Sequence, residues 1–237
     1  MDNKLQISNI HQLFNEGEVN EVYALKDITL NFKSGELVLL TGHNGSGKST
    51  LLNIIDGRIR QTKGNVIIDE INVDDLKVYQ RAKYIYRIFQ NTLNGVIQMA
   101  SISENMALAS KRNSNFKLTS RLIKKSENEK FKNIVDKYNK TLSENLDKKI
   151  FTLSPGERQA VILSLMEIQK ESEPQILLAD EPTASLDPEM AKKSIEAIFN
   201  LSKKGWLCVV VTHDRDFINS NYVDRIIRFN NGIIENN

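Results

Sequence analysis

The residues most capable of chemistry form a glycine-rich loop that ends near position 50. The loop contains the spacing G-x-x-x-x-G-K-S and reads Gly42-His43-Asn44-Gly45-Ser46-Gly47-Lys48-Ser49-Thr50. In such loops the glycines let successive backbone N–H groups point inward, where they hold phosphate oxygens. Lys48 is expected to reach the β- and γ-phosphates, and Ser49 to offer its hydroxyl to Mg²⁺. The loop therefore predicts a site for a nucleoside triphosphate and leaves the base open.

Two adjacent carboxylates close an apolar run further along the chain. Residues 176–179 are typical of a buried strand, and Asp180 and Glu181 follow them directly. In phosphate-loop enzymes a strand-end aspartate helps to hold Mg²⁺, a role that suits Asp180. Glu181 stands where a base could orient the attacking water. Many strands end in acidic turns, but downstream of a phosphate loop the catalytic interpretation is favoured.

A third motif lies between the first two and reads Leu153-Ser154-Pro155-Gly156-Glu157-Arg158-Gln159. Ser154 suits a helix N-cap, Pro155 the first helical position, and Glu157 the end of a capping box. A helix start exposes N–H groups, which bind phosphate readily. The motif therefore predicts a helix start, either as a plain cap or as a further phosphate site.

Strands and helices must position these motifs, and the apolar pattern predicts them. Residues 28–32 alternate apolar and polar, as in a half-buried strand, and 37–40 form an apolar run typical of a buried strand. A helical pattern follows Lys48 and is closed by Gly57. The phosphate loop is thus expected between a strand and a helix, which is the context it requires.

The second half of the chain changes from helical to alternating character. Helical patterns dominate 91–170, after which strands are expected at 176–179, 207–212 and 223–229, with a helix over 188–203. Strand, helix and strand in succession are typical of a parallel sheet.

With its motifs in this order, the chain resembles the ABC-type ATPases, whose signature sequence is usually L-S-G-G-Q. The resemblance covers residues 5–234. It implies ATP and Mg²⁺ as cofactors. It also implies that Ser154, Gly156 and Glu157 bind the γ-phosphate of an ATP that a second subunit holds.

Other landmarks of the family follow in order. Gln90 resembles the Q-loop glutamine, which binds the metal where the core meets the helical insert, and Ser185-Leu186-Asp187 resembles the D-loop. His213, at a strand end, resembles the switch histidine that contacts the γ-phosphate. Phe14 takes the place of the aromatic ring that stacks on adenine; Tyr23 is the neighbouring alternative, and core packing is the plain one.

Two positions depart from the family pattern. Pro155 replaces the first signature glycine and removes one N–H donor, and Glu157 replaces the signature glutamine. Lys48, Glu181 and His213 are all present, so the resemblance implies a working ATPase with these three as its catalytic residues.

The resemblance also implies the fold. We expect an α/β structure: a P-loop NTPase core of the ABC type, with an N-terminal antiparallel β subdomain and an inserted α-helical subdomain. Residues 1–237 are expected to form a single ABC ATPase domain. Within it, 1–90 and about 171–237 form the nucleotide-binding core, and about 91–170 form the helical subdomain.

Composition limits the classes of partner and the cellular location that are expected. The chain has 32 Lys and Arg against 30 Asp and Glu, a net charge of +2, so no overall field favours a nucleic-acid partner. Cys208 is the single cysteine and lies in an apolar run, which suggests a buried thiol in an intracellular protein. No signal-peptide pattern is seen, and no apolar run reaches the roughly 20 residues of a membrane helix. A cytoplasmic location is expected, at the membrane only through a partner.

The family context implies the partners. We expect a homodimer, or a pair with a related ATPase subunit, an integral membrane permease and, indirectly, a substrate-binding protein. The stretches 14–21 and 87–109 resemble bacterial import ATPases encoded with a substrate-binding lipoprotein and a branched-chain-amino-acid-type permease. Some members of that group are linked to aromatic amino-acid uptake. The alternatives are a lipoprotein-releasing or macrolide-export type, and a non-transport regulator that binds a soluble partner.

One segment is a candidate for the permease contact. Residues 90–109 mix turn-prone polar residues with apolar ones, among them Ile97 and Met99. Such a mixed surface suits a groove for a short permease helix. In the alternative interpretation, the apolar residues pack the core of the helical insert.

Overall fold

A computed structural model of the chain describes residues 3–111, 125–169, 175–184 and 186–235. It separates into two compact units. The first comprises Met1–Arg87, Gln175–Glu181 and Ile198–Asn237, and the second Ile88–Pro174 and Pro182–Ala197. The second unit thus takes in 182–197, which the sequence analysis grouped with the core. The domain boundaries expected from the sequence stay a prediction.

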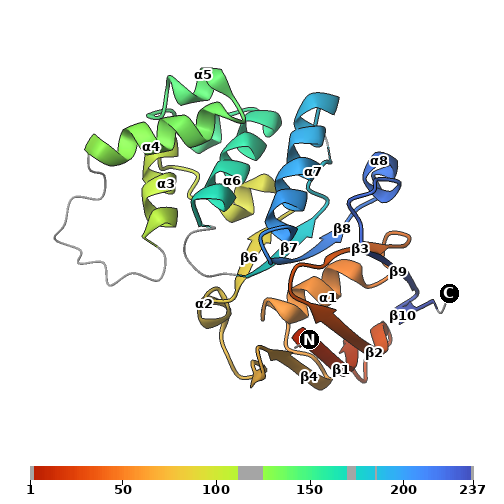
Figure 1. The fold of residues 1–237 in the computed structure, drawn as a ribbon. Helices are drawn as coiled ribbons and strands as arrows, with labels where there is room; N and C mark the ends of the chain where they lie inside the picture. Colours follow the sequence, from red (N-terminus) through yellow and green to blue (C-terminus); the bar gives the residue numbers. More distant parts are fainter. Residues whose placement is uncertain (1–2, 112–124, 170–174, 185, 236–237) are drawn as a thin grey trace. The chain divides into compact units, whose positions relative to one another are not determined.

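The first unit begins with a four-stranded antiparallel sheet in the order β2-β1-β4-β5, of which Figure 1 labels β1, β2 and β4. Its strands are β1 (Asn3–Phe14), β2 (Val22–Lys33), β4 (Lys63–Ile68) and β5 (Ile71–Asn72). Along β2 the side chains of Ile28 and Phe32 are buried, as their alternation with polar residues predicts. This sheet is the antiparallel β subdomain expected from the sequence.

A six-stranded sheet in the order β10-β9-β3-β8-β7-β6 positions the glycine-rich loop and the acidic pair Asp180 and Glu181. Its strands are β3 (Leu37–Thr41), β6 (Ile85–Ile88), β7 (Ile176–Asp180), β8 (Leu207–Val211), β9 (Arg225–Asn230) and β10 (Ile233–Ile234). β3 pairs in parallel with β8 and β9, and β8 with β7. Their carboxyl ends therefore meet at one edge, where the glycine-rich loop and the Asp180 carboxylate lie.

The strand before the glycine-rich loop and the helix after it are both anchored in the core of the first unit. Residues 37–40 are wholly buried, and so are Leu51 and Leu52 of α1 (Lys48–Ile55). Cys208 is buried in β8, and burial raises the pKa of its thiol above the ordinary value. Two short helices, α2 (Val78–Arg81) and α8 (Arg215–Ile218), complete the unit with the end of α7 (Pro188–Ser202).

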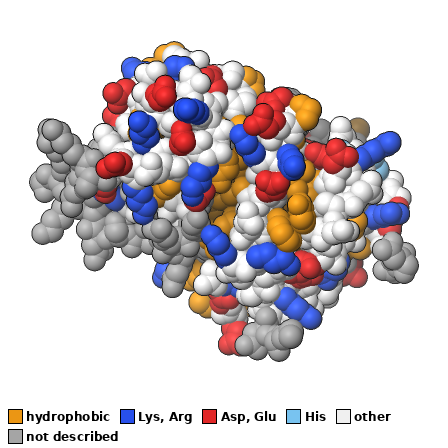
Figure 2. Space-filling model, turned by 45° about the horizontal axis from the view of Figure 1, so that its top comes forward, with side chains coloured by type: hydrophobic (Ala, Val, Ile, Leu, Met, Phe, Trp, Pro, Cys, Tyr) orange, Lys and Arg blue, Asp and Glu red, His pale blue; other side chains and the backbone are white. Residues whose placement is uncertain are grey.

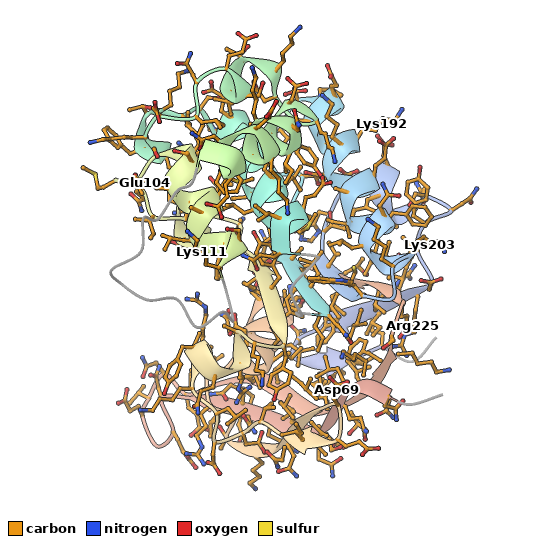
Figure 3. The ribbon with its side chains drawn as sticks, turned by 60° about the vertical axis from the view of Figure 1, so that its left-hand side comes forward. Asp69, Glu104, Lys111, Lys192, Lys203 and Arg225 are labelled. Carbon is orange, nitrogen blue, oxygen red and sulfur yellow. The ribbon has the colours of Figure 1, made fainter. Side chains whose placement is uncertain are left out.

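The second unit is helical, with no strand of its own among its described residues beyond the end of β6. Its helices are η1 (Thr92–Gly95), α3 (Ile102–Ser110), α4 (Lys125–Asp136), α5 (Lys140–Ser143), η2 (Ile150–Thr152), α6 (Pro155–Gln169) and the start of α7. Figure 3 labels Glu104 and Lys111 at the two ends of α3. Glu104 accepts from the Ser101 N–H at 2.7 Å, which fixes the start of that helix.

The surface carries both signs of charge. On the face shown in Figure 2, basic and acidic side chains are interspersed. Among the residues that the structure describes, none of the helices combines the length and the apolar character that a membrane span requires.

Candidate nucleotide-binding site

The glycine-rich loop joins β3 to α1, as the sequence predicts. The Lys48 ammonium lies inside the loop, where it donates to the carbonyl oxygens of Gly42 at 2.7 Å and His43 at 2.8 Å. Burial lowers the pKa of Lys48, while the carboxylates of Glu181 and Asp180 oppose that shift. The Lys48 amine is thus held where the loop would enclose phosphates.

Gly47 is required by the geometry of this loop. Its φ is 103°, and a Cβ placed there would lie 2.5 Å from the carbonyl oxygen of Ala24. Any side chain would push the loop away from β2. Gly47 also caps α1, so the positive end of the helix dipole begins at the loop.

Asp180 stands opposite the first turn of α1. Its Oδ1 accepts from the Ser49 hydroxyl at 3.3 Å, which brings together the two groups expected to bind Mg²⁺. A hydroxyl and a carboxylate oxygen suit Mg²⁺, whose other ligands are usually waters and substrate phosphates. In the part of the chain that the structure describes, no cluster of three or more His, Cys, Asp or Glu could hold a metal alone. The donors fit a Mg²⁺ that arrives with the nucleotide.

Glu181 and His213 face one another at the ends of β7 and β8. Glu181 Oε2 accepts from the His213 N–H at 3.4 Å, and Oε1 lies 3.5 Å from His213 Nε2. The backbone of Glu181 has φ 50°, which is unusual for a residue with a side chain. Burial raises the pKa of the Glu181 carboxyl, against the opposing pull of His213. A carboxylate that loses water on folding is a better proton acceptor than an exposed one.

Two aromatic rings lie at the hairpin end of β1 and β2. Phe14 is half-buried and pairs in register with Val22. The Tyr23 side chain is 51% exposed, with the Lys26 ammonium 5.4 Å from its ring centroid. Both rings therefore stay candidates for stacking on adenine.

The helix predicted at the third motif is present in the second unit as α6. Glu157 accepts from the Ser154 N–H at 2.8 Å, and the Glu157 N–H donates to Ser154 Oγ at 3.3 Å, so the expected capping box forms. The bond from Ser154 lowers the pKa of Glu157, with help from Lys148 at 3.7 Å. Gly156 has open space around its Cα. The start of α6 is thus uncovered within its own unit.

Two further predicted residues lie in the second unit. Gln90 is exposed just beyond β6, and its metal contact stays a prediction. In the expected D-loop, Asp187 caps α7 by accepting from the Met190 N–H at 3.0 Å. Ser185 lies outside the described residues.

Comparison with known families identifies this arrangement. The sequence profile described as ABC transporter matches residues 25–184. The chain belongs to the ABC transporter family. As an ABC ATPase subunit it binds ATP with Mg²⁺ and hydrolyses the ATP.

Individual relatives agree with the family. A tyrosine transport ATP-binding protein of Clostridioides difficile (strain R20291) is 32% identical over 96% of this chain and 89% of its own length. A Staphylococcus haemolyticus protein with a provisional name for hemin import is 31% identical over 98% of this chain and 99% of its own length. Among solved structures, the cassette MJ0796 with ADP and Pi, in a dimeric post-hydrolysis state, matches with a TM-score of 0.81. Its sequence is 29% identical, and the match covers 98% of this chain and 97% of that chain. These likenesses confirm the ABC cassette fold.

Two features of this ABC subunit were not predicted from the sequence. Arg87, on β6, places its guanidinium between Asp56 and Asp180. Its partners come from distant parts of the chain, so no local pattern could indicate them. Phe151 is 50% exposed, and its N–H donates to the carbonyl oxygen of Gln98 at 3.1 Å. It adds an aromatic ring beside the segment that was predicted to contact a permease.

Proposed function

We propose that this ABC subunit drives solute uptake through a separate membrane permease, with an amino acid as the solute. The observation that carries the ATP-driven part of the proposal is the site itself. Lys48, Asp180, Glu181 and His213 lie around one phosphate loop at one edge of one sheet. A relative with a provisional name for hemin import supports uptake as the direction. The relative named for tyrosine transport supports an amino acid as the solute.

The proposed chemistry assigns each side chain a role. Lys48 holds the β- and γ-phosphates, and the loop N–H groups share their charge. Ser49 and Asp180 would hold Mg²⁺, with Gln90 as a further expected ligand, and the bound metal would neutralise charge on the phosphate oxygens. Glu181 takes a proton from the water that attacks the γ-phosphorus, while the bond to the bridging oxygen breaks and ADP leaves.

His213 completes the mechanism on the far side of the γ-phosphate. Its ring lies 3.5 Å from Glu181, so it can hold both the carboxylate and a phosphate oxygen. The adenine would stack on Phe14 or on the more exposed Tyr23.

We further propose that two chains pair head to tail with two ATP molecules between them. Each chain has one phosphate loop and one uncovered signature helix, so a twofold axis would let Ser154, Gly156 and Glu157 of one chain cap the ATP of the other. The dimeric structures of the MJ0796 cassette, 29% identical to this chain, support the pairing. Pro155 removes one N–H donor from this cap, so we expect weaker closure than a glycine would allow.

The pairing can be tested by trapping the ATP-bound state. Glu181→Gln should retain ATP and elute with the mass of a dimer in size exclusion with light scattering, in ATP and Mg²⁺. Lys48→Ala, which loses the phosphate contact, serves as the matched control and should stay monomeric. A strict monomer for Glu181→Gln under saturating ATP would count against the pairing.

An exposed apolar patch supports the permease contact. It consists of Ile97, Met99 and Phe151, whose side chains are 52%, 67% and 50% exposed. Ile102, from the same segment, is wholly buried and packs the helical unit. The patch is therefore available to a partner, whereas the core alternative suits Ile102. A short apolar permease helix matches it in chemistry.

The finer assignment is a permease of the branched-chain-amino-acid type with a substrate-binding lipoprotein. Its alternatives are a lipoprotein-releasing or macrolide-export complex and a regulator that binds a soluble partner. Affinity purification from membranes, with identification of the co-purifying protein, separates all three. A permease together with a binding protein supports uptake, a permease with a large extracytoplasmic loop favours export, and a soluble partner alone refutes transport.

A further inference from the structure

Arg87 forms a buried bridge between the helix of the phosphate loop and the acidic strand end. Its Nη2 lies 3.3 Å from Asp180 Oδ2, and its Nε lies 3.7 Å from Asp56 Oδ2. The Arg87 side chain is only 8% exposed. Nη2 is also 3.5 Å from Asn53 Oδ1, on the last full turn of α1. One cation is thus enclosed by two carboxylates and an amide oxygen.

The two oxygens of the Asp180 carboxylate face different partners. Its Oδ1 faces the Ser49 hydroxyl at 3.3 Å, on the side assigned to Mg²⁺, while its Oδ2 faces Arg87. A buried carboxylate needs a counter-charge, because leaving one uncompensated is costly. Arg87 supplies that charge permanently, since a guanidinium does not lose its proton in proteins. Mg²⁺ must therefore bind a carboxylate whose charge is already partly neutralised.

We propose that Arg87 sets the Mg²⁺ affinity of the site by acting as a fixed counter-charge to Asp180. The inference rests on the proposed assignment of Ser49 and Asp180 to the metal. With Arg87 in place, the protein donors alone attract Mg²⁺ weakly, and the metal binds together with the nucleotide phosphates. Its release can then follow the loss of those phosphates.

Substituting Arg87 separates charge from shape. Arg87→Met keeps a long apolar stem and removes the cation, so Asp180 should attract Mg²⁺ more strongly. The half-saturating concentration of Mg²⁺ should fall on the order of tenfold, because a unit charge this close is weakly screened. Arg87→Lys keeps the charge and should leave the Mg²⁺ response nearly unchanged. If Arg87 merely orients Asp180, the opposite result is expected: both Arg87→Met and Arg87→Lys should bind Mg²⁺ more weakly.

The measurement is the affinity for a fluorescent, non-hydrolysable ATP analogue, titrated with Mg²⁺ from an EDTA-treated start. Arg225→Met is the matched control (Figure 3). Arg225 pairs with Glu36 at 3.0 Å and lies beside Val38, near the start of β3 and away from its loop end. This control should lose stability without a change in the Mg²⁺ response.

A second variant keeps the test decisive if Arg87→Met does not fold. Arg87→Met with Asp56→Asn removes one cation and one anion together and leaves Asp180 intact. Tighter Mg²⁺ binding in either folded variant supports the inference, and unchanged or weaker binding overturns it. If Mg²⁺ does not change the nucleotide affinity of the parent protein, the assignment of Asp180 to the metal fails. If it does in the parent but Arg87→Met does not bind Mg²⁺ more tightly, only the role of Arg87 fails.

Discussion

Replacing Glu181 with glutamine should stop hydrolysis while nucleotide binding survives. Glutamine has the shape of glutamate, and the Glu181 side chain is 16% exposed, so the substitution fits the same space. What it removes is the ability to accept a proton from water. Loss of a positioned base costs roughly 10²- to 10⁴-fold in rate. Lys48 and its contacts in the phosphate loop are untouched.

The same change should not destabilise the protein at neutral pH. Burial raises the pKa of Glu181, so the fold favours the protonated carboxyl over the charged one. For such a group the stabilising contribution is present below the unfolded pKa and is lost as pH rises through the folded pKa. Burial therefore opposes the charged form of Glu181, a cost that the uncharged glutamine side chain does not have. The positive φ of 50° is common to both residues and cancels from the difference.

Two measurements on the purified subunit check this prediction. Steady-state phosphate release should fall as stated, and the binding of a fluorescent ATP analogue should be retained. In the parent, kcat should decline as pH falls through the raised pKa of Glu181, and this decline should be absent from the residual activity of the variant. Chemical denaturation at pH 7 should find Glu181→Gln at least as stable as the parent. Near-normal turnover would refute the assignment of the base, and a marked loss of stability would refute the charge argument.

Two other predictions follow from exposure and from close packing. Changing both Ile97 and Met99 to Asp should abolish co-purification with the permease yet cost less than about 1 kcal/mol of stability at each site, because both side chains are largely exposed. A thermal melt and a pull-down decide it, since an unfolded variant, or a folded one that still binds, would contradict the docking patch. Gly57→Ala should destabilise the fold by about 1–3 kcal/mol, because the new Cβ would lie 2.8 Å from Arg81 at φ 82°. Gly205→Ala, at φ 90° with nothing within 4 Å, is the control and should cost clearly less in denaturant unfolding.

Local motifs made much of the site predictable. The phosphate loop, the acidic strand end and the capping box of Ser154 and Glu157 each lie within a few residues, so spacing alone carries their chemistry. Their strands were equally accessible, because buried parallel strands are continuous apolar runs such as 37–40. The antiparallel subdomain followed from the family resemblance and agrees with the order β2-β1-β4-β5.

Features made by distant residues could not be predicted in this way. Arg87 has partners at 53, 56 and 180, and nothing within its own strand indicates them. The exposure of Ile97 depends on how the segment before α3 turns, where the Asn105 side chain bonds to both the N–H and the C=O of Ile97. Composition could show only that the segment contains both polar and apolar residues. Two-residue strands such as β10 are too short for any periodic pattern.

The helix of the phosphate loop is fixed at both ends, and this bears on how the site binds. At its carboxyl end, the Arg81 guanidinium donates to the carbonyl oxygens of Ile54 at 2.7 Å and Ile55 at 2.9 Å. Carbonyls of the last turn lack donors from within the helix, although the Gly57 N–H also donates to the Ile54 carbonyl at 3.1 Å, and a cation there opposes the negative end of the helix dipole. Arg81 is 2% exposed, so its desolvation is costly and must be offset by these bonds. A helix held in this way keeps its amino end, and Lys48 with it, ready for phosphate, so little ordering remains to be done when ATP binds.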